Sequence, residues 1–212
     1  MPPQSPLDEI STDLTRRRYD RVAPLYDLVE AMMERIAFSR WRPLLWSRVQ
    51  GPRVLEVGVG TGKNFPYYPA HCQVTAIDLS PNMLARARRR AETMSLSIDL
   101  QVMDVQALSF PDSIFDTVVS SFVFCSVPDP VRGLREVRRV CRPGGQVLLL
   151  EHVLSQKPWM RVMMRLFNPL VVRIVGANID RDTVGNVERA GLKIVSVADL
   201  SGDIVKLIEA KP

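Results

Sequence analysis

Residues 54–64 read Val-Leu-Glu-Val-Gly-Val-Gly-Thr-Gly-Lys-Asn. The apolar first half is typical of a buried strand, and glycines follow at alternate positions, Gly58, Gly60 and Gly62. Because glycine has no Cβ, it adopts positive φ easily and lets a ligand approach the backbone. In a doubly wound α/β sheet the turn after the first strand is where ligands bind. The stretch therefore predicts an α/β fold with a ligand site at this turn.

Two other interpretations of the glycines are a bare strand-to-helix turn and a dinucleotide-binding loop, G-x-G-x-x-G. Counted from Gly58, the dinucleotide loop needs a glycine at position 63, where the chain has Lys63. Asp78 ends the next apolar stretch, and a carboxylate there can accept hydrogen bonds from both hydroxyls of a ribose. Ser80 is already placed to cap the following helix. Asp78 therefore favours a ligand site over a bare turn.

Three further segments continue the pattern: Met-Asp-Val-Gln-Ala-Leu at 103–108, Phe-Asp-Thr-Val-Val-Ser-Ser at 115–121 and Arg-Pro-Gly-Gly at 142–145. Together with the glycine loop and Asp78, and without a gap over residues 53–151, this order resembles the class I S-adenosylmethionine-dependent methyltransferases. The resemblance implies S-adenosylmethionine as cofactor, with S-adenosylhomocysteine as product. It also implies an α/β, Rossmann-like, doubly wound seven-stranded sheet whose last strand is antiparallel.

The resemblance also implies which residues hold the cofactor. The glycine loop would hold the methionine portion, Asp78 the ribose, and Asp104 with Val105 the adenine, whose faces would pack on Leu79 and Met83. Ser121 would lie beside the cofactor. The full expected set is Tyr19, Glu56, Gly58, Gly60, Thr61, Gly62, Asp78, Leu79, Met83, Asp104, Val105 and Ser121.

Apolar stretches of strand length recur along the rest of the chain. Strands are predicted at 54–57, 74–77, 98–103, 117–121 and 146–151, and two final strands near 192–198 and 203–209. Helical segments separate them, and Ser80-Pro81 and Asp129-Pro130 are typical helix starts. This alternation predicts a parallel sheet with helices on both faces.

The composition fits one globular domain with an appendage. Of 212 residues 46% are hydrophobic and 24% are charged, with a net charge of +5. We expect a helical lid over 1–50 and a methyltransferase domain over 51–212, which carries a basic amphipathic insertion at 155–178. The 3 cysteines and 2 histidines lack metal-ligand spacing, so we expect no metal site, free thiols and a reducing compartment.

The N-terminal segment from Tyr19 to Asp27 has the spacing Tyr-Asp-x-x-Ala-x-x-Tyr-Asp. It resembles the lid of the branch that contains quinone C-methyltransferases and bacterial phospholipid N-methyltransferases. There the helix folds over the cofactor and forms one wall of the substrate site, so Tyr26 is a candidate for orienting or deprotonating a methyl acceptor. In the alternative interpretation, Tyr19 and Tyr26 only pack the helix on the sheet.

Glu151-His152-Val153 ends the fifth predicted strand, at the edge that faces the site in this fold. His152 is a candidate base near neutral pH. The alternative is a structural histidine with hydrogen-bonded ring nitrogens.

The insertion combines basic and apolar side chains. Lys157, Arg161, Arg165 and Arg173 are its charged residues, and 152–179 contains no acidic residue. Asn168-Pro169 predicts the start of a second short helix. A cationic amphipathic helix suits an anionic membrane surface, and Arg173 is a candidate for a lipid phosphate. Residues 35–48 also combine basic and apolar side chains, with Trp41 and Trp46 among arginines. The alternative is an insertion packed on the sheet with a solvated basic face.

Short motifs at 60–69, 124–130 and 151–153 resemble phospholipid N-methyltransferases and also, in part, membrane-associated thiol methyltransferases. The leading hypothesis is stepwise methylation of phosphatidylethanolamine toward phosphatidylcholine. The alternatives are a quinone precursor or a small hydrophobic thiol or amine, and a noncatalytic membrane-binding module. We expect a cytoplasmic monomer, peripheral on the inner face of the membrane, with no nucleic-acid partner. No signal peptide and no stretch of about 20 apolar residues is evident.

Overall fold

The structure is a computed structural model that describes residues 10–21, 39–175 and 178–212. A single sheet of seven strands has the order β3-β2-β1-β4-β5-β7-β6. The strands are β1 (Arg53–Val57), β2 (Gln73–Asp78), β3 (Asp99–Val102), β4 (Phe115–Ser121), β5 (Cys141–His152), β6 (Lys193–Ser201) and β7 (Val205–Lys211). Strand β7 runs antiparallel to both of its neighbours. The predicted seven-stranded sheet with an antiparallel last strand is confirmed.

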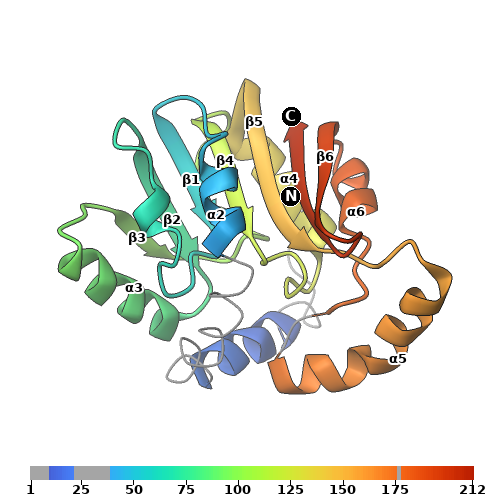
Figure 1. Ribbon diagram of the computed structural model, residues 1–212. Coiled ribbons are helices and arrows are strands. Elements are labelled where there is room, and N and C mark those ends of the chain that lie inside the picture. Colours follow the sequence, from blue (N-terminus) through green and yellow to red (C-terminus); the bar gives the residue numbers. More distant parts are fainter. Residues whose placement is uncertain (1–9, 22–38, 176–177) are drawn as a thin grey trace.

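Helices cover both faces of this sheet (Figure 1). The helices of residues 39–175 and 178–212 are α2 (Ser39–Trp46), α3 (Pro81–Thr93), α4 (Pro130–Val140), α5 (Pro158–Val175) and α6 (Thr183–Arg189), with a short 3-10 helix η2 (Phe65–Tyr67). Of these, α5 lies beyond the edge of the sheet at which the parallel strands end (Figure 1). A further helix spans residues 10–21. The division between a lid and a domain at residue 50 stays a prediction.

Side chains along the central strands point alternately to the two faces of the sheet, and each face packs against different helices. Leu55 and Leu149 belong to the core that includes α4 and α6, while Val54 and Leu148 belong to the core that includes Leu45 and Trp46 of α2. Since successive side chains of a strand point to opposite faces, these central strands need apolar residues at almost every position. This explains why the sequence shows continuous apolar runs there.

The expected break at Asn168-Pro169 is wrong, because α5 continues through Pro169 to Val175. The side chain of Asn168 does not cap a new helix. Its Oδ1 accepts from the Ile179 amide at 2.9 Å, and its Nδ2 donates to Asn178 at 3.3 Å. Asn168 therefore fastens the segment after α5 back onto the helix. Within the described residues, no helix is both long and apolar enough to span a bilayer.

Candidate functional site

A cavity of about 730 Å³, counted out to its open mouth, lies at the carboxyl ends of β1, β2 and β4. Nine of the residues expected to hold a cofactor line it: Tyr19, Gly58, Gly60, Asp78, Leu79, Met83, Asp104, Val105 and Ser121. They come from the 10–21 helix, the glycine loop, the ends of β2, β3 and β4, and the first turn of α3. The fold thus brings together residues that are up to a hundred positions apart in the chain.

The three glycines of the loop differ in what surrounds the position of a Cβ atom. Gly58 has φ +68°, and a Cβ there would lie 2.2 Å from the Val123 side chain. Gly62 has φ +80°, and its Cβ would overlap the Phe65 ring. At Gly60, with φ +57°, a Cβ would meet nothing within 4 Å. Gly60 is therefore the position where the backbone itself borders open space in which a ligand can lie.

Asp78 connects the glycine loop to the start of α3. Its Oδ2 accepts from the Gly60 amide at 2.8 Å, and its Oδ1 accepts from the Ser80 amide at 2.8 Å. Burial, helped by the nearby Asp20 carboxylate, raises the pKa of Asp78 to about 6. Ser80 caps α3 as expected, since its Oγ accepts from the Met83 amide at 3.1 Å. Asp78 is thus placed both to shape the loop and to accept hydrogen bonds from a ligand.

Asp104 lies where the 10–21 helix meets the end of β3. Its Oδ1 accepts from the Gln106 amide at 2.8 Å, and its Oδ2 accepts from the Thr12 hydroxyl at 3.5 Å. The Gln106 side chain also donates to Thr12 at 3.1 Å. The candidate adenine-binding residue therefore contacts the N-terminal helix directly.

Two more contacts hold the 10–21 helix over the cavity. The Tyr19 hydroxyl and Ser126 Oγ are 2.6 Å apart. Asp20 Oδ1 accepts from the Ser80 hydroxyl at 2.5 Å and from the Asn82 amide at 3.3 Å. The helix therefore forms a wall of the cavity, as a lid would. Tyr26, the candidate acceptor-orienting residue, lies outside the described residues.

Three expected cofactor residues, Glu56, Thr61 and Gly62, do not line the cavity. Glu56 is 1% exposed and accepts from Asn64 Nδ2 at 2.5 Å and from the Tyr68 hydroxyl. Burial raises the pKa of Glu56 to about 7. A direct contact with the cofactor stays a prediction for these residues, and the structure gives Glu56 a role beneath the loop.

Asn64 extends this network in two directions. Its Oδ1 accepts from the buried Arg42 at 2.9 Å, and its Nδ2 also lies 3.2 Å from Ser121 Oγ, which lines the cavity. Since Arg42 and Trp46 are 5% and 1% exposed, α2 does not present them to a membrane. The expected membrane role of these two residues is wrong, because α2 packs on the sheet.

His152 does not line the cavity, whereas Phe122 does. The two rings are in contact, with centroids 4.8 Å apart and planes tilted by 38°, and burial lowers the pKa of His152. Phe122 has φ +58°, which is uncommon for a residue with a large side chain and is often found at functional sites. The role of His152 as a base stays a prediction. Its neighbour Phe122 lines the cavity although it is not among the residues predicted from the sequence.

Glu151 holds the Phe122 turn in place. Its Oε1 accepts from the Ser120 hydroxyl at 2.9 Å, the Val123 amide at 3.0 Å and the Phe124 amide at 3.2 Å. Other lining residues absent from the expected set are Thr15, Ile77, Met103, Val123, Ser126, Val127 and Pro128. A usable signal for several of them is their position just after a strand at the carboxyl edge. Arg173, near the end of α5, is exposed and does not line the cavity.

Tyr19→Phe is expected to weaken S-adenosylhomocysteine binding by about 3- to 10-fold, because the variant loses one hydrogen bond worth about 1 kcal/mol between the lid and Ser126. Calorimetry on both proteins measures the change. Ser126→Ala should weaken binding similarly, and the double variant should add little to either single change. An additive double variant would mean that the Tyr19 hydroxyl and Ser126 act separately.

The sequence matches the family model described as a methyltransferase domain over residues 55–149. It is 43% identical to a phosphatidylethanolamine N-methyltransferase of Cereibacter sphaeroides over 147 residues, which are 68% of this chain and 71% of that protein. It is 38% identical to a demethylmenaquinone methyltransferase of Renibacterium salmoninarum, with 63% and 56% of the two chains covered. A human thiol S-methyltransferase is 36% identical, with 72% and 66% covered. The match thus spans less than two thirds of the last two relatives.

Solved structures share the fold at low sequence identity. The [4+2]-cyclase SpnF superposes with a TM-score of 0.69 at 22% identity, covering 82% of this chain and 80% of that one. An S-adenosylmethionine-dependent methyltransferase from Mesorhizobium loti superposes with a TM-score of 0.63 at 22% identity, covering 80% and 96%. These likenesses concern the fold alone.

Proposed function

Because this chain belongs to the class I S-adenosylmethionine-dependent methyltransferases, we propose that it methylates the amine of phosphatidylethanolamine stepwise toward phosphatidylcholine, at the inner surface of a membrane. S-adenosylmethionine is its cofactor, and the residues around the cavity suit that ligand. Gly60 leaves space for it, Asp78 and Asp104 offer carboxylates at two separate places, and Leu79 and Met83 offer apolar surface. When bound, the cofactor supplies a methyl group already activated by a sulfonium.

The protein's part in such a transfer is chiefly alignment and exclusion of water. Tyr19 and Ser126 close the cavity on one side, and Phe122 presents an aromatic ring on another. An amine must lose its proton before it attacks, so a base near the acceptor helps. We propose Tyr26 and His152 for orienting or deprotonating the amine, and Arg173 for the lipid phosphate.

The observation that carries the lipid assignment is the exposed apolar surface of α5, which stands beside the similarity to the Cereibacter enzyme. Trp159 and Leu166 are 65% and 68% exposed. Soluble proteins rarely expose a row of large apolar side chains without a partner. If the substrate is a lipid that stays in its membrane, the exposed apolar surface of α5 would bind that membrane. The demethylmenaquinone and thiol relatives support the second candidate, a hydrophobic quinone precursor or thiol.

The test incubates the full chain with methyl-labelled S-adenosylmethionine and vesicles that contain phosphatidylethanolamine and phosphatidylglycerol. We expect label in mono-, di- and trimethylated lipid, and an Arg173→Ala variant that needs several-fold more lipid for half-maximal rate. Arg138→Ala, on α4, is the matched control and should behave as wild type. Parallel reactions contain a demethylated quinone or an alkyl thiol. Label in one of these, with none in lipid, would overturn the lipid assignment and leave the methyltransferase family intact.

A further inference from the structure

The helix at residues 10–21 has two faces with different surroundings. Thr12, Thr15 and Tyr19 share the inner face: Thr15 and Tyr19 line the cavity, and Thr12 bonds to Asp104. Ile10 and Leu14 lie on the outer face and are 57% and 51% exposed. The outer face also carries exposed arginines at 17, 18 and 21. One helix therefore contacts the cofactor cavity on one side and presents a basic apolar surface on the other.

The outer surface of α5 has the same character. Its exposed apolar side chains are Trp159, Val162, Met163, Leu166, Phe167 and Leu170, between 44% and 68% exposed. Their spacing of three and four residues puts them on one helical face. Exposed Arg165 and Arg173 accompany them. This surface is apolar and cationic together.

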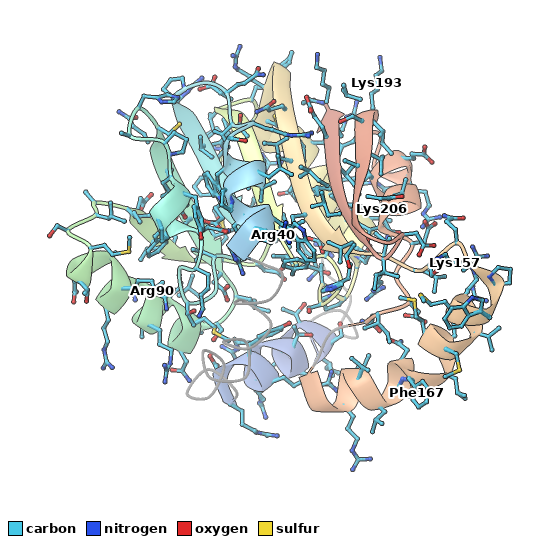
Figure 2. All side chains as sticks on the ribbon, in the orientation of Figure 1. Arg40, Arg90, Lys157, Phe167, Lys193 and Lys206 are labelled. Carbon is cyan, nitrogen blue, oxygen red and sulfur yellow. The ribbon has the colours of Figure 1, made fainter. Side chains whose placement is uncertain are left out.

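Both helices lie beyond the same edge of the sheet, the edge at which the parallel strands end (Figure 1). Phe167 lies on α5 at this edge (Figure 2). The cavity opens at this edge too, since its lining comes from the ends of β1, β2 and β4. A single flat partner can therefore lie near α5, the 10–21 helix and the cavity.

Charge favours an anionic lipid layer over a second copy of the chain. The exposed charges of α5 are all positive, because 152–179 contains no acidic residue. On the 10–21 helix Asp13 pairs with Arg16 and Arg17, and Asp20 faces Ser80, which leaves Arg18 and Arg21 toward the outside. Two such surfaces placed face to face would repel each other, whereas anionic headgroups would attract them.

We propose that an anionic lipid bilayer binds α5 and the outer face of the 10–21 helix together, and that this contact holds the helix closed over the cofactor. The inference rests on the membrane-surface part of the proposed function and adds a coupling between docking and cofactor binding. Tyr19, Thr12 and Asp20 fasten the inner face by polar contacts to Ser126, Asp104 and Ser80. Lipid bound to Ile10 and Leu14 would press the helix toward the same position. Each ligand then strengthens the binding of the other by the same factor.

The test measures S-adenosylhomocysteine binding to the full chain by calorimetry, with and without pure phosphatidylglycerol vesicles, which contain no amine to methylate. We expect binding at least about 5-fold tighter on vesicles, the lower end of usual coupling between sites. In sedimentation, S-adenosylhomocysteine should in turn increase the fraction of protein bound to vesicles.

Two variants separate coupling from docking. Ile10→Ser/Leu14→Ser should keep the affinity for S-adenosylhomocysteine in solution and lose most of the tightening on vesicles. Leu166→Ser/Phe167→Ser should need more lipid to dock and recover the full tightening at saturating lipid. Val195→Ser on β6, at a side chain 53% exposed, is the matched control and should match wild type in both measurements. Circular dichroism establishes that each variant is folded.

Equal affinity for S-adenosylhomocysteine on and off vesicles, with the protein fully vesicle-bound, would overturn the coupling. So would an apolar surface covered by a second copy, seen as a stable dimer that does not bind vesicles. These outcomes are independent of the acceptor: a protein that shows coupling and methylates a quinone precursor or a thiol refutes the phosphatidylethanolamine assignment alone.

Discussion

Asp78→Ala is expected to weaken S-adenosylhomocysteine binding by at least about 100-fold, a loss of roughly 3 kcal/mol. In the structure both carboxylate oxygens accept from backbone amides, those of Gly60 and Ser80. Alanine would leave both amides unpaired, at a cost of about 1–3 kcal/mol for each buried donor. The glycine loop would no longer be fastened to α3, and the cavity would lose its carboxylate. Calorimetry with S-adenosylhomocysteine measures the affinity.

Asp78→Asn tests the same argument with the shape of the side chain preserved. One oxygen remains to accept, so we expect about a 10-fold loss, consistent with a single broken hydrogen bond of this kind. Asp99→Ala, at the start of β3 and bonded to the Gln101 side chain, is the matched control and should bind as wild type does. Wild-type affinity in a folded Asp78→Ala protein would mean that the cofactor binds elsewhere.

The sequence predicts those parts of the site whose residues lie at a recognisable position relative to a strand. The glycine loop directly follows β1, Asp78 is the last residue of β2, and Asp104 comes two residues after the end of β3. Since the carboxyl ends of parallel strands meet at one edge, their positions in space follow from their positions in the chain. The lid contact of Tyr19 follows from the resemblance to a known branch of the family.

The sequence does not reveal contacts that depend on packing between distant segments. Arg42 looks like a solvated arginine beside tryptophans, and only the fold brings it to Asn64, beneath the glycine loop. Glu56 looks like a ligand-binding carboxylate, and only the fold brings Tyr68 to it. His152 stands out in the sequence for its chemistry. Phe122 lines the cavity with a φ of +58°, and nothing in its residue type indicates that conformation.

The buried carboxyls predict an unusual pH dependence of stability. Burial raises the pKa of both Glu56 and Glu151 from 4.5 to about 7, which corresponds to roughly 3 kcal/mol for each over the full titration. Because the folded pKa lies above the unfolded value, this contribution is fully present below pH 4.5 and is lost as the pH rises through 7. We expect the Tm to be on the order of 10 °C lower at pH 8 than at pH 5. Thermal unfolding followed by circular dichroism measures it.

Glu151→Gln separates this effect from other titrations. The glutamine keeps an oxygen for the donors at Ser120, Val123 and Phe124 and has no charge to bury. Asp78, whose pKa burial raises to about 6, contributes in the same direction as Glu56. The variant should therefore lose roughly a third to a half of the Tm difference between pH 5 and pH 8. His152 acts in the opposite direction below its ordinary pKa of 6.5, because burial favours its neutral form, so the rise in Tm on acidification should flatten toward pH 5. Glu188→Gln, at an exposed position on α6, is the control and should keep the wild-type profile. A Tm that rises from pH 5 to pH 8 would mean that both carboxyls are ionised in the fold and that their hydrogen-bond donors stabilise the charge more than burial opposes it.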